Sequence, residues 1–91
     1  MAVTVRVPTQ LRSLTGGASE ASVDGSTVAE VLKSLDAAHP GFAERLFDDG
    51  GGLRRFVNVF VADEDIRFLQ NLDTRVGPGQ VVSIVPAVAG G

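Results

Sequence analysis

The C-terminus of the sequence offers one group suited to chemistry, the carboxylate of Gly91, which follows Gly90. Glycine has no Cβ, so a Gly-Gly end adopts backbone angles closed to other residues and passes through a narrow channel. A carboxylate is a poor electrophile, but ATP can convert it into an acyl-adenylate, which is a good acyl donor. We therefore interpret Gly91 as a candidate acyl donor. The alternative is an ordinary frayed terminus.

The residues before Gly91 are predicted to form a flexible tail over 86–91 that partners bind. Proline fixes its own φ and so keeps the chain extended where it leaves the last predicted strand. Val88 has no core left to enter, which favours docking over a plain strand end. The predicted docking residues are Pro86, Ala87, Val88, Ala89 and Gly90.

Composition excludes several classes of function. The chain has 91 residues, enough for one domain over 1–91, and a formal net charge of −3, which weighs against nucleic-acid and anionic-membrane partners. It has no cysteine and a single histidine, His39. We see no set of acid, base or nucleophile, and so predict a protein that is not an enzyme, with no bound cofactor or metal. No apolar run spans a bilayer and no secretory signal is visible, so we expect a cytoplasmic protein.

The first half of the sequence predicts a β-hairpin and one amphipathic helix. Alternation indicates a strand over 3–7, and 18–24 reads as a weaker strand at a sheet edge. Thr27 and Glu30 have the spacing of a capping box, in which each side chain reaches the other's backbone N–H. The apolar stripe of the helix is Val28, Val31, Leu32 and Leu35. A further helical turn is expected at 41–47.

The second half predicts three more strands. The most apolar covers 56–61, with Val57, Val59 and Val61 facing the core. Residues 63–65 read as a solvated acidic turn, and residues 66–68 are expected to begin a short returning strand. A brief helical turn within 69–76 precedes the last strand, at 81–85.

This order predicts an α+β protein with the β-grasp (ubiquitin-like) fold, a mixed sheet of about five strands covered by one main helix. The helix gives the right-handed crossover that places the last strand parallel to the first. We expect the end of the last strand at a sheet edge.

Three residues are candidates for a partner surface. Phe60, with Phe56 and Asn58, is expected on the sheet face away from the helix, where an apolar patch would bind a partner. The alternative is that Phe60 packs under a loop. Arg54 and Arg55 either pair with acidic groups of a partner or are simply solvated.

Essentially the whole sequence resembles the ThiS/MoaD family of ubiquitin-like sulfur carriers, most specifically at the tail. The ending Pro86-Ala87-Val88-Ala89-Gly90-Gly91 is similar to that family's Pro-Pro-Val-Ala-Gly-Gly. Residues 57–67 resemble its third strand and acidic turn, and residues 77–85 its last turn and strand, although Gln80 stands within a turn where the family more often has Gly-Asp-Glu. Residues 55–58 with the Ala-Gly-Gly end are most similar to the family's actinobacterial carriers for cysteine biosynthesis.

The resemblance implies a carrier cycle. An E1-like adenylyltransferase/sulfurtransferase of the MoeB/ThiF type would use ATP to adenylate Gly91, and a sulfur donor would then leave a C-terminal thiocarboxylate. A PLP-dependent cysteine synthase would accept the sulfur, and a JAMM-type metalloprotease would release cysteine.

Other outcomes stay open from the sequence. Related carriers serve molybdopterin, thiamin thiazole or a thiosugar. A ubiquitin-like modifier that forms lysine conjugates would use the same tail, whereas a small binding module would tolerate loss of Gly90 and Gly91.

Overall fold

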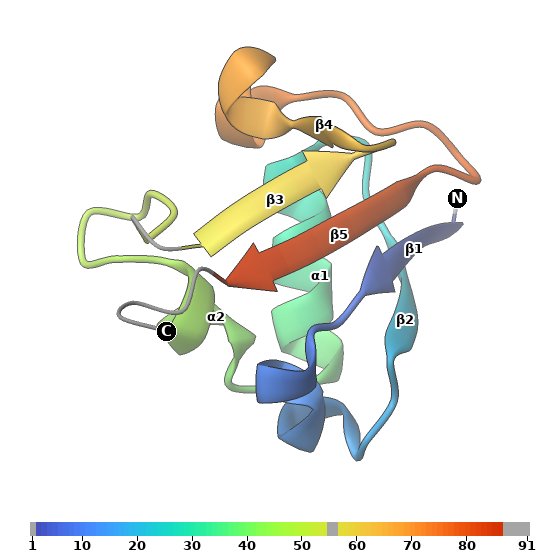
Figure 1. The fold of residues 1–91 in the computed structure, drawn as a ribbon, viewed down its shortest axis with the longest axis vertical. Coiled ribbons are helices and arrows are strands. Elements are labelled where there is room, and N and C mark those ends of the chain that lie inside the picture. Colours follow the sequence, from blue (N-terminus) through green and yellow to red (C-terminus); the bar gives the residue numbers. More distant parts are fainter. Residues whose placement is uncertain (1, 55–56, 87–91) are drawn as a thin grey trace.

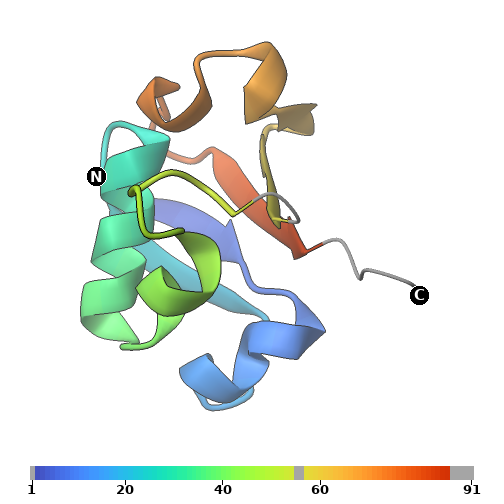
Figure 2. The same ribbon diagram turned by 90° about the vertical axis from the view of Figure 1, so that its left-hand side faces the viewer.

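One mixed β-sheet with two α-helices on one side forms the structure (Figures 1 and 2). The computed structural model describes residues 2–54 and 57–86. Along the chain the elements are β1 (Ala2–Arg6), the 3₁₀ helix η1 (Thr9–Thr15), β2 (Glu20–Asp24), α1 (Val28–Ala38), α2 (Phe42–Leu46), β3 (Val57–Val61), β4 (Glu64–Asp65), the 3₁₀ helices η2 (Ile66–Phe68) and η3 (Asn71–Asp73), and β5 (Val81–Pro86). The five strands are ordered β2-β1-β5-β3-β4, so the predicted α+β, β-grasp arrangement is confirmed.

The last strand, β5, lies at the centre of the sheet (Figure 1). It runs parallel to β1, with Thr4 opposite Val81, and antiparallel to β3, with Val57 opposite Pro86. The parallel pairing with the first strand is as predicted. β5 as a whole is not an edge strand, since Val82 and Ser83 pair with both β1 and β3, but its last three residues have a strand partner on one side only, as expected for the end of the strand.

The two strands beside β5 pair with different lengths of it. β1 is paired only as far as Ser83, opposite Arg6, whereas β3 follows β5 to Pro86. Pro8 follows shortly after β1 and has no N–H to donate, which is consistent with the end of the ladder there. Residues 84–86 therefore pair with β3 alone.

The core lies between the sheet and α1. All four residues of the predicted apolar stripe are fully buried, as are Phe42 and Leu46 of α2. The sheet contributes the valines that sequence alternation assigns to this face, among them Val5, Val59 and Val61, and β5 adds Val82. α1 ends at His39, whose N–H donates to the Leu35 carbonyl at 2.8 Å, just before Pro40.

The start of α1 differs in one detail from the predicted capping box. Thr27 Oγ1 accepts a hydrogen bond from the Glu30 N–H at 3.2 Å, as expected. The Glu30 carboxylate, however, accepts from the N–H and the hydroxyl of Ser26, at 3.0 and 2.9 Å, rather than from Thr27. Ser26 therefore presents two donors to one carboxylate oxygen.

The segment after β3 also departs from the prediction. The returning strand is Glu64–Asp65, and Ile66–Phe68 is a 3₁₀ helix rather than strand. Asp65 Oδ1 accepts from the Arg67 N–H at 2.8 Å, which caps this helix and ends the ladder. Ile66 is buried while Phe68 is exposed, and a strand would have put both on one face. The turn between the strands lies at Ala62 and Asp63, which both have positive φ.

We expect Leu32→Ala to lower the free energy of unfolding by about 2–5 kcal/mol, because the side chain is fully buried and would leave a cavity. Urea unfolding checks this, with the exposed neighbour Lys33→Ala as the control. Equal stabilities of the two variants would contradict the assignment of α1 as the main cover of the core.

The Ser26 N–H and then the Ser26 hydroxyl hold the pKa of Glu30 below its ordinary value of 4.5. A lowered pKa stabilises the fold where the carboxylate is ionised, and this contribution is lost as pH falls below 4.5 through the folded-state pKa. The stability difference between wild type and Glu30→Gln is therefore expected to be constant near neutral pH and to shrink on acidification. Urea titrations across this range test it, and a pH-independent difference would refute it.

Candidate functional site

The candidate site begins where β5 ends. Pro86 is the last described residue and pairs with Val57 at the start of β3. The predicted acyl donor, Gly91, lies outside the described residues, as do the predicted docking residues Ala87, Val88, Ala89 and Gly90. Their roles stay predictions. The structure fixes the position of Pro86, the residue that precedes them.

The sheet face around this point is not covered by the α-helices. α1 and α2 lie on the other side of the sheet (Figure 2). On β5, Val82 and Ile84 are buried against the helices, so Ser83 and Val85 occupy the opposite, outer face. Val85, the residue before Pro86, is 46% exposed, which is high for a valine within a sheet.

Phe60 lies on this outer face, as the alternation predicts. Its neighbours on β3, Val59 and Val61, are buried in the core, whereas Phe60 is only partly buried. It stands opposite Ser83 of β5 and Asp65 of β4. Its role as a partner surface stays a prediction.

Of the two arginines of the predicted partner surface, Arg54 and Arg55, the structure describes only Arg54. Arg54 is partly buried, and its Nε donates to the Glu44 carbonyl at 3.1 Å. Its backbone N–H donates to the Leu46 carbonyl at 2.8 Å. Arg54 therefore fastens the loop before β3 to α2. Arg55 and the neighbouring Phe56 lie outside the described residues.

A third arginine, which the sequence did not single out, lies close to the end of β5. Arg67 Nη1 donates to Asn58 Oδ1 at 2.7 Å, and Nη2 donates to the Val57 carbonyl at 3.1 Å. Asn58 and Val57 are the residues opposite Val85 and Pro86. The alternation of Ile66, Arg67 and Phe68 is that of a half-buried strand, so the sequence signal that was available for the turn is Asp65, a residue type that caps helices.

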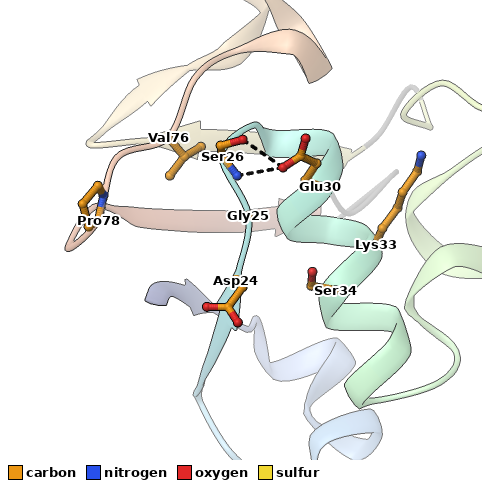
Figure 3. A pocket seen from close by; sticks show the side chains of 8 residues that line it. All are labelled: Asp24, Gly25, Ser26, Glu30, Lys33, Ser34, Val76 and Pro78. Atoms are coloured by element: carbon orange, nitrogen blue, oxygen red, sulfur yellow. Dashed lines mark hydrogen bonds between the residues drawn. The ribbon is translucent and has the colours of Figure 1, made fainter. Parts of the chain in front are cut away.

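Two cavities lie at different positions along β5. A cavity of about 410 Å³ lies beside β5, lined by Arg6, Arg12, Ser83 and Val85 among others. A larger one of about 640 Å³ is bordered by Asp24, Ser26, Glu30, Lys33, Val76 and Pro78 (Figure 3). Because Pro78 precedes β5, the larger cavity lies at the opposite end of the strand from Pro86.

The residues with charged or metal-binding side chains do not form a metal centre in the described part of the chain. Over 2–54 and 57–86, no group of three or more His, Asp or Glu residues is placed to hold a metal ion. The acidic turn at 63–65 instead uses Asp65 for a backbone hydrogen bond. In the same ranges, no helix is long and apolar enough to cross a membrane.

Known proteins that resemble this chain belong to the family that its sequence resembles. Residues 5–91 match the ThiS family. Sulfur carrier protein CysO of Mycobacterium tuberculosis (strain ATCC 25618 / H37Rv) is 48% identical over 93 residues, covering 100% of both chains. Small archaeal modifier protein 3 of Haloferax volcanii is 40% identical over 68 residues, covering 75% of this chain and 73% of the relative.

Solved structures give the same result. A chain of the crystal structure of the Amycolatopsis orientalis BexX/CysO complex is 44% identical and superposes with a TM-score of 0.93, over 99% of this chain and 100% of that one. Both the sequence and the fold therefore match along the whole length, and the chain belongs to the ThiS family.

Proposed function

We propose that this chain is a sulfur carrier for cysteine biosynthesis, whose Gly91 carboxylate is adenylated and then converted into a thiocarboxylate. The observation that carries the proposal is the full-length match to CysO, at 48% identity over 100% of both chains. The sequence adds the Gly90-Gly91 end. The geometry adds a centrally held strand that stops five residues before the carboxylate, at Pro86.

The activation step joins the carboxylate to AMP. A carboxylate oxygen of Gly91 attacks the α-phosphorus of ATP and pyrophosphate leaves, which gives an acyl-adenylate. A sulfur nucleophile then attacks the acyl carbon and AMP leaves, which gives the thiocarboxylate. The groups that catalyse both steps belong to an E1-like partner of the MoeB/ThiF type, and ATP binds to that partner. The Amycolatopsis structure that this chain resembles is of a BexX/CysO complex, which supports a function that involves a protein partner.

The chain's own contribution is to keep the carboxylate within a limited distance of the end of β5. Pro86 is held in register against Val57, and residues 87–91 span at most about 17 Å when extended. The absence of cysteine removes a thiol that could attack the chain's own acyl-adenylate. An enzyme that takes Gly91 into its active site must therefore also contact the surface around Pro86.

The later partners follow from the same proposal. A PLP-dependent cysteine synthase would accept the thiocarboxylate sulfur, and a JAMM-type metalloprotease would then hydrolyse the bond between Gly91 and the cysteine formed, which releases cysteine and regenerates the Gly91 carboxylate. Phe60 is the side chain of the outer face that we assign to contact with these enzymes. The cycle uses cytoplasmic ATP and metabolites, which is why we place the protein in the cytoplasm.

A second function is favoured by one observation, the similarity to small archaeal modifier protein 3. A modifier would pass its activated Gly91 to a lysine amine rather than to sulfur. The test is to purify the chain from its own cells under denaturing conditions, digest the sample and analyse the peptides by mass spectrometry. We expect no peptides in which the chain is joined to a lysine. Abundant peptides with the Gly-Gly end on lysine would favour the modifier.

The carboxylate itself is tested by variants of Gly91. We expect Gly91→Ala to slow adenylation by about 100-fold, because a Cβ displaces the reacting group in a narrow channel. Deletion of Gly91 should abolish adenylation, because it withdraws the carboxylate by about 3.3 Å. The assay is ATP–pyrophosphate exchange with the organism's MoeB/ThiF-type enzyme, with the exposed Gln10→Ala as the control. Wild-type exchange by the deletion would refute the proposal.

A further inference from the structure

We propose that this chain protects its activated Gly91 from its own amines, because the surface within reach of the last residues carries arginine instead of lysine. The proposal rests on the proposed function and concerns the selectivity of the same carboxylate, for sulfur over amine. An acyl-adenylate reacts with a neutral amine as well as with sulfur. A carrier that is activated in this way therefore needs a surface without competing nucleophiles.

The first observation is the choice of basic residues. Of the eight Lys and Arg residues in the sequence, only Lys33 is a lysine, and the chain has no cysteine and no tyrosine. Lysine is ordinarily among the commonest residues of globular proteins. The guanidinium of arginine stays protonated and has no lone pair with which to attack a carbonyl, whereas a small fraction of lysine side chains is neutral and nucleophilic. Arginine therefore supplies positive charge without a competing amine.

The second observation is that arginines lie on both sides of the strand that leads to the tail. Arg6 and Arg12 line the cavity of about 410 Å³ beside β5. On the side of β3, the Arg67 guanidinium donates to the carbonyl of Val57, the residue opposite Pro86, at 3.1 Å. The basic side chains described on both sides of the end of β5 are thus of the kind that an acyl-adenylate does not acylate.

The position of Arg6 shows that the tail can return to this surface. Arg6 is exposed and stands opposite Ser83 of β5, and its neighbour Val5 is buried in the core, so Arg6 is on the outer face. With about 3.3 Å per residue along β5 and about 4.8 Å between strands, its Cα lies roughly 11 Å from that of Pro86. This is shorter than the span of about 17 Å that residues 87–91 allow. An amine at position 6 would therefore be within reach of the activated carboxylate.

The third observation is that Lys33 is on the other side of the molecule. It is an exposed residue of α1, which covers the inner face of the sheet (Figure 2). It also borders the larger cavity, at the opposite end of β5 from Pro86 (Figure 3). A helix with its side chains is about 10–12 Å across, so α1 and the sheet together separate Lys33 from the outer face. The single histidine, His39, ends the same helix.

The reaction that this arrangement prevents is the formation of an internal amide. The neutral Nζ of a lysine attacks the acyl carbon of Gly91, a C–N bond forms, the bond from that carbon to the AMP oxygen breaks, and the amine passes a proton to solvent. The chain then ends in an amide that a sulfur donor does not displace. Groups tethered in one chain have a high effective concentration, so even a small neutral fraction of such a lysine competes with a donor in solution.

The test moves the single lysine without changing the composition. Lys33→Arg combined with Arg6→Lys places the lysine on the outer face. Lys33→Arg combined with Arg75→Lys places it at an exposed position paired with Thr27 at the start of α1, beyond the reach of residues 87–91 from Pro86.

Each full-length chain is incubated with the organism's MoeB/ThiF-type enzyme and ATP, without a sulfur donor, and its intact mass and fragments are measured. We expect the chain with Arg6→Lys to lose one water molecule through an amide between Gly91 and position 6. The yield should exceed that of the Arg75→Lys chain and of wild type by about 10-fold or more, because only position 6 has the high effective concentration.

The outcomes separate this proposal from the one it rests on. All three chains should show the same thermal midpoint and the same ATP–pyrophosphate exchange. Arg6 Nε lies 3.8 Å from Glu20 Oε2 at an exposed position, a contact that contributes little to stability and that lysine can also make. Normal exchange with no internal amide from the Arg6→Lys chain, or with equal amounts from all three chains, would overturn the protection and leave the carrier function intact. No exchange with the wild-type chain would overturn the carrier function and the protection together.

Discussion

The pairing of β5 with a strand on each side is the constraint on which the structure depends. β1 holds residues 81–83 of β5 in parallel register, and β3 holds residues 82–86 in antiparallel register. A parallel neighbour requires a crossover, and α1 supplies it while covering the inner face of the sheet. The C-terminal strand therefore cannot shift without disturbing both the N-terminal hairpin and the core. This fixes the position of Pro86, the last described residue.

The same arrangement divides the molecule into two faces with different tasks. The inner face is closed by the fully buried stripe of α1 and by Phe42 and Leu46 of α2. The outer face bears Phe60 and Val85, and Arg67 bonds to Asn58 on it. A carrier needs this division, because its reactive carboxylate is generic and partners must recognise the body. In our account the tail supplies the chemistry, and the outer face supplies the selectivity.

The sequence predicts the elements whose patterns are strong and local. The valine alternations of β1 and β3 and the apolar stripe from Val28 to Leu35 appear where expected. The central position of β5 was missed because strand order depends on long-range pairing, which no local pattern encodes. The 3₁₀ helix at Ile66–Phe68 was missed because an aspartate cap competes with an apolar run that looks like strand. The hydrogen bonds from Arg67 to β3 depend on that turn and were missed with it.

Intact-mass spectrometry of the full-length chain tests the central claim most directly. The chain is incubated with its adenylating enzyme, ATP and a sulfur donor, and the product is fragmented. Our account predicts a mass increase equal to the difference between a sulfur and an oxygen atom, located on Gly91 and absent without ATP. The account would be contradicted if the enzyme adenylates the chain but no product with sulfur in place of oxygen forms. A sulfur atom located on a residue other than Gly91 would also contradict it.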